Sequence, residues 1–257
     1  MNNLRFWILL LASWIVFSSP VVAEPDEFDW RVFDAVIKQH VSGRQLHGIQ
    51  TRVVAYEALL GDDQFLEIAN QLKLYDPGEL GREQKLAFYI NAYNYFAINT
   101  VLANWPLESI RDVGSFFSPV WGKKTGYINN KAVTLEEIEH EILRKMGEPR
   151  IHFAIVCCSN SCPDLRGEVF TAADLEVQLQ DQVQKFVDNQ GKGATVFEDE
   201  LLVSKIFDWF EEDFEQDGGV IAFISSYAPQ YAKYKSYDTL HYDWRLNNLA
   251  EATGVVE

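Results

Sequence analysis

Residues 79–105 form the longest helical pattern in the chain, and they restrict the fold more than any other segment. Apolar and aromatic side chains recur on nearly every side of this pattern, at Leu86, Phe88, Tyr89, Ile90, Tyr93, Phe96, Ala97, Val101 and Leu102. A helix that is apolar around most of its circumference has to be covered by other elements. The pattern therefore predicts a central helix with the rest of the chain packed around it.

Shorter patterns predict the elements that surround this helix. Capping residues and 3.6-residue periodicity indicate helices at residues 27–41, 62–74, 134–146, 171–187, 205–214 and 220–227. The expected caps include Asp62 or Asp63, Thr134 in a capping box with Glu137, and Ser204. Residues 49–60 are expected to begin as a strand and turn helical, and residues 127–133 and 195–203 to form hairpins. We expect one α+β domain over residues 24–257, rich in helix, with a small and mostly antiparallel sheet.

The first residues have the pattern of a secretory signal. Arg5 supplies the positive charge, residues 6–17 an apolar core, and Val21 to Ala23 a small-residue cleavage site. The core is shorter than the ~20 residues of a membrane span, although an uncleaved anchor is the alternative. We expect an exported protein, periplasmic or secreted, with a mature chain near Glu24 and no stable membrane insertion after cleavage.

Charge and motifs exclude several functional classes. The formal net charge is −16, which argues against nucleic acid and anionic lipid surfaces as partners. The sequence contains no nucleophile elbow, phosphate-binding glycine loop, zinc-protease motif or calcium loop, so no cofactor is expected. The partner that we expect is therefore a small-molecule or peptide-like substrate.

Residues 148–167 hold all three cysteines and the most favourable setting for chemistry. Residues 151–156 are apolar and rich in β-branched side chains, which predicts a buried strand carrying His152. A tight turn follows from Cys158 to Cys162, and Pro163 ends it. A cysteine on such a turn is a candidate nucleophile because nearby positive charge or a helix N-terminus stabilises its thiolate.

The resulting hypothesis is a thiol-dependent hydrolase or acyl transferase, papain-like or transglutaminase-like, that acts on a peptide-like or amide substrate. Cys162 would be the nucleophile, His152 its base, and Asn91 of the long helix an orienting amide or oxyanion donor.

Polar residues near the same helix are the candidates for substrate binding. Polar side chains on an otherwise apolar helix are hydrogen-bonded in the core or line a pocket, and this predicts roles for Glu83, Tyr93 and Asn94. Arg166 is a candidate carboxylate clamp, with pairing to acidic side chains as the alternative. Four aromatic residues are expected in the core: Trp209, Phe210, Tyr242 and Trp244.

Two alternatives involve the same sulfurs. In an oxidising compartment Cys158 and Cys162 could form a structural disulfide, since three intervening residues allow the required approach, and the protein would then be a non-catalytic binding or interaction module. A zinc site would use His140, His152, Cys158 and Cys162, but their spacing is not a familiar zinc signature, and no metal is assigned.

Several segments together resemble the family catalogued as domain of unknown function 547 (DUF547). The matching segments are REQKLAFYINAYN, SIRD, LEEIEHEILR, PRIHFAIVCCSNSCPDLR, SKIFDWFEEDF and YDWRLN, which span most of residues 80–247 in one order. The family pattern has a single cysteine before the turn, and we assign that position to Cys158, with Cys157 as an additional strand residue. The resemblance implies no particular activity.

Overall fold

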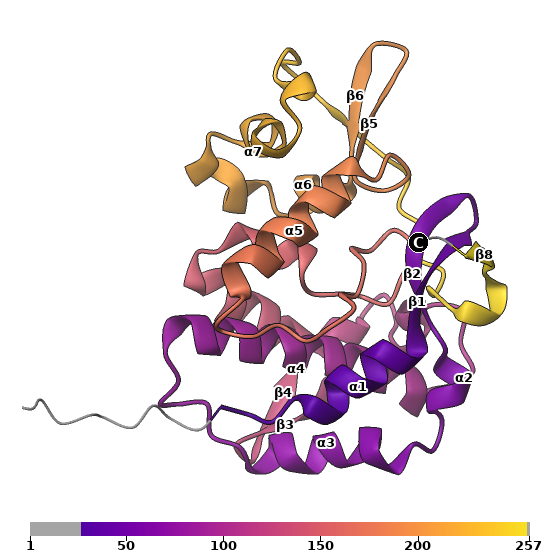
Figure 1. Ribbon diagram of the computed structural model, residues 1–257, viewed down its shortest axis with the longest axis vertical. Coiled ribbons are helices and arrows are strands. Elements are labelled where there is room, and N and C mark those ends of the chain that lie inside the picture. Colours follow the sequence, from indigo (N-terminus) through magenta and orange to yellow (C-terminus); the bar gives the residue numbers. More distant parts are fainter. Residues whose placement is uncertain (1–26, 256–257) are drawn as a thin grey trace, which may run out of the picture.

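The computed structural model describes residues 27–255, so the signal segment predicted at residues 1–23 lies outside the described residues. The predicted central helix is α4 (Arg82–Ala103), and most of its side chains are buried. It crosses the middle of the molecule between α5 (Leu175–Asp188) on one side and α1 (Arg31–His40) and α3 (Asp63–Leu74) on the other (Figure 1). The apolar circumference of the pattern therefore predicted its position correctly.

The strands form three small sheets among the described residues. Two of them, β3–β4 and the β2–β1–β8 sheet, are antiparallel, and the third adds the parallel neighbour β7 to the β5–β6 hairpin. The strands are β1 (Val41–Leu46), β2 (Ile49–Val54), β3 (Lys124–Ile128), β4 (Lys131–Thr134), β5 (Ala194–Phe197), β6 (Glu200–Val203), β7 (Asp238–Thr239) and β8 (Thr253–Val255). The α+β class is confirmed, with several small sheets in place of one.

Short helices fill the connections. The α-helical ones are α2 (Tyr56–Leu59), α6 (Lys205–Trp209) and α7 (Val220–Tyr227), and Glu137–Leu143 is a π-helix. The 3₁₀ helices are Ile110–Val113, Val120–Gly122, Arg144–Met146, Pro149–Phe153, Glu211–Asp217, Pro229–Tyr231 and Leu249–Glu251. None of the helices in the described part of the chain is long and apolar enough to cross a membrane.

The capping residues predicted from the sequence have the expected contacts. Thr134 and Glu137 exchange hydrogen bonds: the Glu137 backbone donates to Thr134 Oγ1 at 3.0 Å, and the Thr134 backbone donates to Glu137 Oε2 at 2.9 Å. Asp62 and Ser204 likewise accept hydrogen bonds from backbone N–H groups at the starts of α3 and α6. These local signals fixed the helix starts because each satisfies backbone donors that the helix itself leaves free.

The buried strand predicted at residues 151–156 is not formed. This segment is the 3₁₀ helix Pro149–Phe153 followed by a turn, and it is buried between α4 and α5. Side-chain amides bond its peptide groups where strand neighbours would: Asn94 bonds Ala154 O and Val156 N at 3.0 and 2.8 Å, and Gln182 bonds Phe153 O at 3.0 Å. An apolar run of this length indicates burial but does not distinguish a strand from other buried structure.

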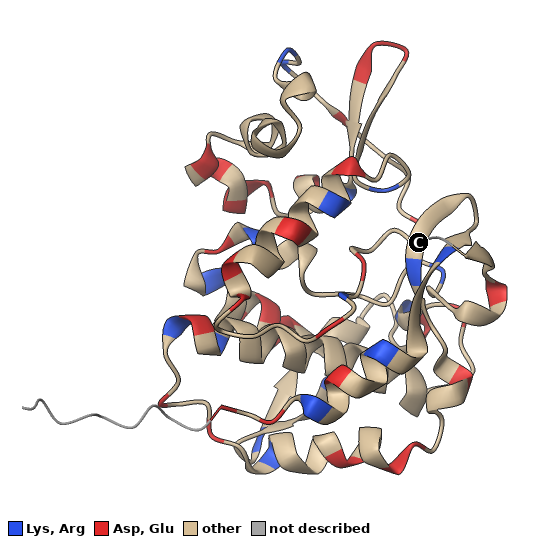
Figure 2. Ribbon diagram, in the orientation of Figure 1, with Lys and Arg blue, Asp and Glu red and all other residues tan. Residues whose placement is uncertain are grey.

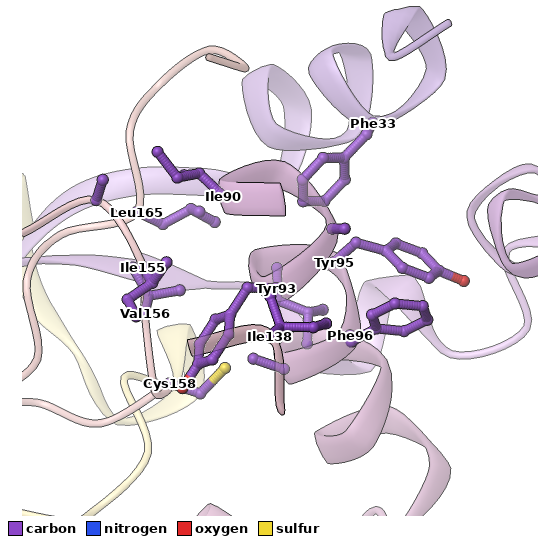
Figure 3. Packing of buried hydrophobic residues seen from close by; sticks show 14 of the residues in the cluster. Phe33, Ile90, Tyr93, Tyr95, Phe96, Ile138, Ile155, Val156, Cys158 and Leu165 are labelled. Carbon is purple, nitrogen blue, oxygen red and sulfur yellow. The ribbon is translucent and has the colours of Figure 1, made fainter. Parts of the chain in front are cut away.

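The hydrophobic interior consists of two clusters. The larger one surrounds α4 and includes Tyr93, Ile155 and Cys158 (Figure 3). The second cluster packs around α5, α6 and α7 and includes Phe153, while half-buried Cys157 packs against both clusters. Acidic residues lie on the surface of both regions, for example on α5 and on the 3₁₀ helix before α7 (Figure 2).

Candidate functional site

A pocket opens where the two hydrophobic clusters meet. Its cavity volume is about 170 Å³, and it collects side chains from α4, the π-helix, the segment 152–163, α6 and the C-terminal segment. The lining residues are Tyr93, Trp121, Glu136, Glu139, His140, His152, Ile155, Cys157, Cys162, Pro163, Ile206, Trp209, Phe210, Tyr242 and Trp244. Three residues predicted for the site, Tyr93, His152 and Cys162, are therefore brought together.

The imidazole of His152 is held rigidly on the 3₁₀ helix Pro149–Phe153. Its ring is 2% exposed, stacks on Phe210 with centroids 4.0 Å apart, and bonds Asp213 through Nε2 at 2.6 Å. Burial lowers the pKa of His152, despite the opposing effect of Asp213, so the ring is neutral near pH 7. Nδ1 has no hydrogen-bond partner among the described residues, so neither cysteine sulfur is bonded to the ring.

Asp213 fixes which nitrogen of His152 carries the proton. Arg144 donates to both carboxylate oxygens of Asp213, at 2.6 and 2.8 Å. Burial alone would raise the pKa of Asp213, but the hydrogen bonds from His152 and Arg144 outweigh it and hold that pKa well below its ordinary value. An ionised Asp213 accepts from His152 Nε2–H, which leaves the lone pair on Nδ1. Sequence reasoning missed Asp213 because it lies in a different segment, 61 positions from His152.

Two cysteine sulfurs face the pocket, and their environments differ. Cys157 is half-buried, with Ser159 Oγ at 3.1 Å and Tyr242 OH at 3.3 Å from its sulfur. Burial raises its pKa, but hydrogen bonds from Cys162, Ser159 and Tyr242 outweigh this and lower the pKa to about 7. Cys162 is 4% exposed and accepts from the Cys157 backbone N–H at 2.7 Å; burial and the neighbouring Cys157 raise its pKa. Cys157 is thus the more acidic and more accessible thiol.

Cys158 is directed away from the pocket. Its φ is +59°, a left-handed backbone conformation that non-glycine residues rarely adopt. The side chains of Cys157 and Cys158 therefore point in different directions. The Cys158 thiol is buried in the α4 cluster (Figure 3), where burial raises its pKa to about 12. All three cysteines are free, so the Cys158–Cys162 disulfide considered from the sequence is not formed.

The C-terminal segment holds the cysteine turn in place. The backbones of Asn160 and Ser161 donate to Arg245 O at 2.8 Å and Asp243 O at 3.2 Å, and the Asp243 backbone donates to Ser161 Oγ at 2.9 Å. Ser159, Asn160 and Ser161 are all buried. The polar turn is therefore an internal part of the structure, and its contacts also position Tyr242 beside Cys157.

A carboxyl group with raised pKa lies next to the imidazole. Glu139 Oε1 is 4.0 Å from His152 Nδ1, and Tyr93 OH donates to Glu139 Oε2 at 3.1 Å. Burial raises the pKa of Glu139 to about 7, although the hydrogen bond from Tyr93 opposes the shift. The pocket therefore combines a neutral imidazole with a thiol and a carboxyl group that each have a pKa of about 7.

The asparagines predicted for the site serve a different purpose. Asn91 is buried with both ends of its amide on the Phe170 backbone, donating to O at 2.8 Å and accepting from N at 2.9 Å. Asn91 does not line the pocket, so the structure does not place it beside Cys162 as the sequence predicted. Asn94 is committed in the same way to Ala154 and Val156. Their polar groups on an apolar helix satisfy buried peptide groups.

Glu83 and Arg166 also lie away from the pocket. Glu83 is exposed in the first turn of α4. Arg166 lies in a second cavity of about 1080 Å³ between β1–β2 and α5, and it is paired with Glu168 and Asp181. The structure therefore has the alternative considered from the sequence, in which Arg166 pairs with acidic side chains.

The aromatic residues assigned to the core also line the pocket, and only Trp209 among them is exposed, while Tyr242 is a buried member of the second cluster and Phe210 and Trp244 pack against it. Trp209, Phe210, Tyr242 and Trp244 all contribute to its wall, and Trp209 is 43% exposed. The rings of Trp209, Tyr242 and Trp244 pack on one another, with Trp209–Tyr242 and Tyr242–Trp244 centroids 4.8 and 4.6 Å apart, whereas Phe210 stacks on His152. Aromatic content alone did not distinguish a core from a pocket wall.

The zinc set considered from the sequence is not assembled. Within residues 27–255, no group of three or more His, Cys, Asp or Glu side chains is arranged to hold a metal ion. His140 bonds Arg144 through Nδ1 at 2.8 Å, and Cys158 is in the core.

Comparison with protein families gives one match. The family model for proteins of unknown function, DUF547, covers residues 77–187. Residues 77–187 are similar to this family and are called the DUF547 region. The resemblance inferred from the sequence is confirmed over that range, while the segments that resemble the family beyond residue 187 are not covered. No curated protein and no solved structure matches the chain.

The DUF547 region contains only part of the pocket. It includes α4, the π-helix, His152 and all three cysteines. Asp213, Trp209, Tyr242 and Trp244 follow it in the chain, yet they orient His152 and Cys157 or wall the cavity. The pocket is therefore built jointly by the DUF547 region and the chain that follows it.

Proposed function

We propose that the pocket is the active site of a thiol-dependent acyl-transfer enzyme, a hydrolase or transferase acting on an amide or peptide-like substrate. The observation that supports this most is the Arg144–Asp213–His152 chain, which leaves a neutral imidazole with its Nδ1 lone pair free in a pocket that also contains an acidic thiol. Nucleophile, base and orienting carboxylate are the three components such chemistry requires.

In this proposal Cys157 is the nucleophile, in place of Cys162. The Cys157 sulfur attacks the substrate carbonyl carbon, a C–S bond forms, and His152 Nδ1 takes the thiol proton. The C–N bond then breaks, and the leaving amine receives that proton from His152. Water or an acceptor amine cleaves the thioester, its proton passes to His152 and then to the departing sulfur, and the thiol is regenerated.

The type of chemistry expected from the sequence is thus retained with different residues. A papain-like or transglutaminase-like arrangement has a thiol, an imidazole and a group that orients the imidazole, and here Asp213 takes the orienting role expected of Asn91. Cys162 becomes the neighbour whose S–H helps to lower the pKa of Cys157. Export remains a prediction from residues 1–23.

Site-resolved alkylation tests this assignment. We expect iodoacetamide to label Cys157 first, with a rate that rises through an inflection near pH 7. Cys157→Ser should abolish the fast labelling. Cys158→Ser is the matched control, because Cys158 follows Cys157 in the sequence but its sulfur is buried. This variant should leave the labelling rate of Cys157 unchanged.

Cys162→Ala separates the two candidate nucleophiles. Fast labelling that persists, with its inflection moved to higher pH, supports Cys157, since the variant removes a hydrogen bond to that sulfur. Loss of all fast labelling would assign the nucleophile to Cys162. If no cysteine reacted faster than an unfolded thiol, and no variant changed the turnover of an acyl ester such as p-nitrophenyl acetate, the enzymatic proposal would be wrong.

A further inference from the structure

The wall of the pocket has a composition that the acyl-transfer chemistry does not require. Aromatic side chains from separate segments line the cavity, among them Trp121 on the 3₁₀ helix Val120–Gly122, Trp209 at the end of α6, and Trp244 near the C-terminus. Trp244 connects the other two, with centroids 5.7 Å from Trp209 and 6.1 Å from Trp121. The rings thus form one continuous aromatic surface.

The charged groups of the lining carry one sign only. Glu136 and Glu139 line the cavity, and none of the described residues that line it is a lysine or arginine. A Cβ added to Gly122 would lie 3.0 Å from Glu136 Oε2, so this carboxylate lies against the backbone next to Trp121. A concave site with carboxylates and aromatic rings attracts cations, because the faces of the rings carry negative electrostatic potential.

Two arginines near the wall do not alter this balance. Arg144 lies 5.2 Å from the Phe210 ring, but Asp213 neutralises it through two hydrogen bonds. Arg111 is exposed and lies 5.1 Å from the Trp244 ring. Neither arginine lines the cavity, and the Arg111 contact shows that a cation is accommodated against this aromatic surface.

The size of the cavity restricts what enters it. Its volume of about 170 Å³ is below the roughly 300–1,000 Å³ typical of sites for drug-sized ligands. One small head group or side-chain end fits, rather than a whole oligomer. The geometry points to an organic ammonium group, on the amide or peptide-like substrate of the proposed enzyme, as the group bound between Glu136 and the tryptophans.

This inference rests on the proposed function for its link to a substrate, whereas the ammonium site itself can be tested without turnover. The probes are choline and its neutral isostere 3,3-dimethylbutanol, titrated into the protein and followed by tryptophan fluorescence and calorimetry. We expect choline to bind at least about tenfold more tightly than the isostere, because both fill the same space and only choline carries the charge.

Variants identify the site. Glu136→Gln should weaken choline binding about threefold to tenfold and leave the isostere unaffected. Glu141→Gln is the matched control, because Glu141 is exposed on the π-helix that starts directly after Glu136, pairs with Lys145 and does not line the cavity. Trp209→Leu, at a side chain that is 43% exposed, should weaken choline in a protein whose circular dichroism is unchanged.

The outcomes separate this inference from the proposed function. Choline binding that survives Cys157→Ser, with no fast-reacting thiol in the parent protein, would keep the ammonium site and reject the enzyme. A fast-reacting Cys157 without choline binding, or with equal binding of choline and isostere, would keep the enzyme and reject the ammonium site. Equal losses from Glu136→Gln and Glu141→Gln would also reject it, since they would indicate nonspecific attraction to an acidic surface.

Discussion

Ionisable side chains in and beside the pocket differ in how far hydrogen bonds offset the effect of burial on their pKa values. Asp213 receives hydrogen bonds from Arg144 and His152 and stays ionised, whereas His152 is buried so fully that its pKa falls. Among residues 27–255, Glu139 accepts a hydrogen bond from the Tyr93 hydroxyl alone, and this bond does not offset the effect of burial on its pKa. Groups whose environments push their pKa values apart can divide acid and base roles among themselves.

Glu139 should make the protein less stable as the pH rises. Its pKa increases from 4.5 to about 7 on folding, so above pH 4.5 the unfolded state loses the proton while the folded state keeps it. Stability should therefore fall between about pH 4.5 and 7, by about 3 kcal/mol in total. Glu139→Gln should remove this decrease, as measured by urea unfolding at about pH 5 and pH 8.

The matched control for this measurement is Glu141→Gln on the same π-helix. Its carboxylate is exposed, and hydrogen bonding to Lys145 lowers its pKa, so the change should leave the decrease between pH 5 and pH 8 in place. If Glu139→Gln kept the same dependence on pH as the parent protein, Glu139 would not be the group that titrates.

Asp213→Asn should reduce turnover without removing the thiol. The amide cannot supply the negative charge that holds the proton on His152 Nε2, so the base is less well defined and Arg144 loses its charge partner. We expect turnover of p-nitrophenyl acetate to fall about 10²–10⁴-fold. Asp217→Asn, exposed at the end of the same 3₁₀ helix, should be neutral; similar rates for both variants would argue against the assignment of Asp213.

At the scale of elements, the sequence predicted those whose signals are local. The helix α4, the caps at Asp62 and Ser204, and the β3–β4 hairpin follow from periodicity and turn residues within a few positions. The segment 151–156 was assigned incorrectly, because its hydrogen bonds go to Asn94 and Gln182 on distant helices. Periodicity contains no information about such partners.

The residues of the candidate site likewise include some that the sequence could select and others that it could not. Cys162 and His152 could be selected because they are close in a distinctive segment, and Tyr93 because it is polar on an apolar helix. Cys157 was passed over because it was assigned to a strand before the turn, whereas that strand is not formed and Cys157 lines the pocket together with Cys162. Asp213, Trp209 and Trp244 come from later segments and Trp121 from an earlier one, and these segments reach the pocket only through the tertiary fold.

Asn94 should contribute to stability far more than a surface asparagine. Asn94→Ala leaves one buried N–H and one buried C=O of the segment 154–156 without partners. Each unmet group costs about 1–3 kcal/mol, so a total loss of about 2–5 kcal/mol is expected from denaturant unfolding. Asn70→Ala is the control, because Asn70 is exposed on α3, and its effect should stay within about 0.5 kcal/mol. Equal losses would mean that the Asn94 contacts are not formed.

At the scale of the whole molecule, the pocket depends on how the two hydrophobic clusters join. Ile155 and Cys162 belong to the cluster around α4, while Ile206 and Tyr242 belong to the cluster around α5, α6 and α7. All four residues line the pocket, and Cys157 packs against both clusters. A site built from both clusters keeps its geometry only if they fold as one cooperative unit.

Phe153→Ala tests that cooperativity. Phe153 is fully buried in the second cluster, where it packs on Phe186, Phe207 and Phe223, and its backbone neighbour Ala154 belongs to the first cluster. The variant should lose about 3–5 kcal/mol. If the clusters unfold together, amide hydrogen exchange should accelerate in α7 and in α4 alike, because both then exchange through the same global opening.

The control is Phe197→Ala, at a side chain that is 61% exposed on the β5–β6 hairpin, and it should change exchange in neither helix. Acceleration confined to α7 in Phe153→Ala would show that the second cluster opens independently of α4. In that case Asp213, Trp209 and Tyr242 would separate from His152 and Cys157 without global unfolding, and thiol reactivity should change together with exchange in α7. Cooperative unfolding predicts instead that both helices and the Cys157 reaction respond to the same loss of stability, because the acid–base groups and the thiol are then held by one folded unit.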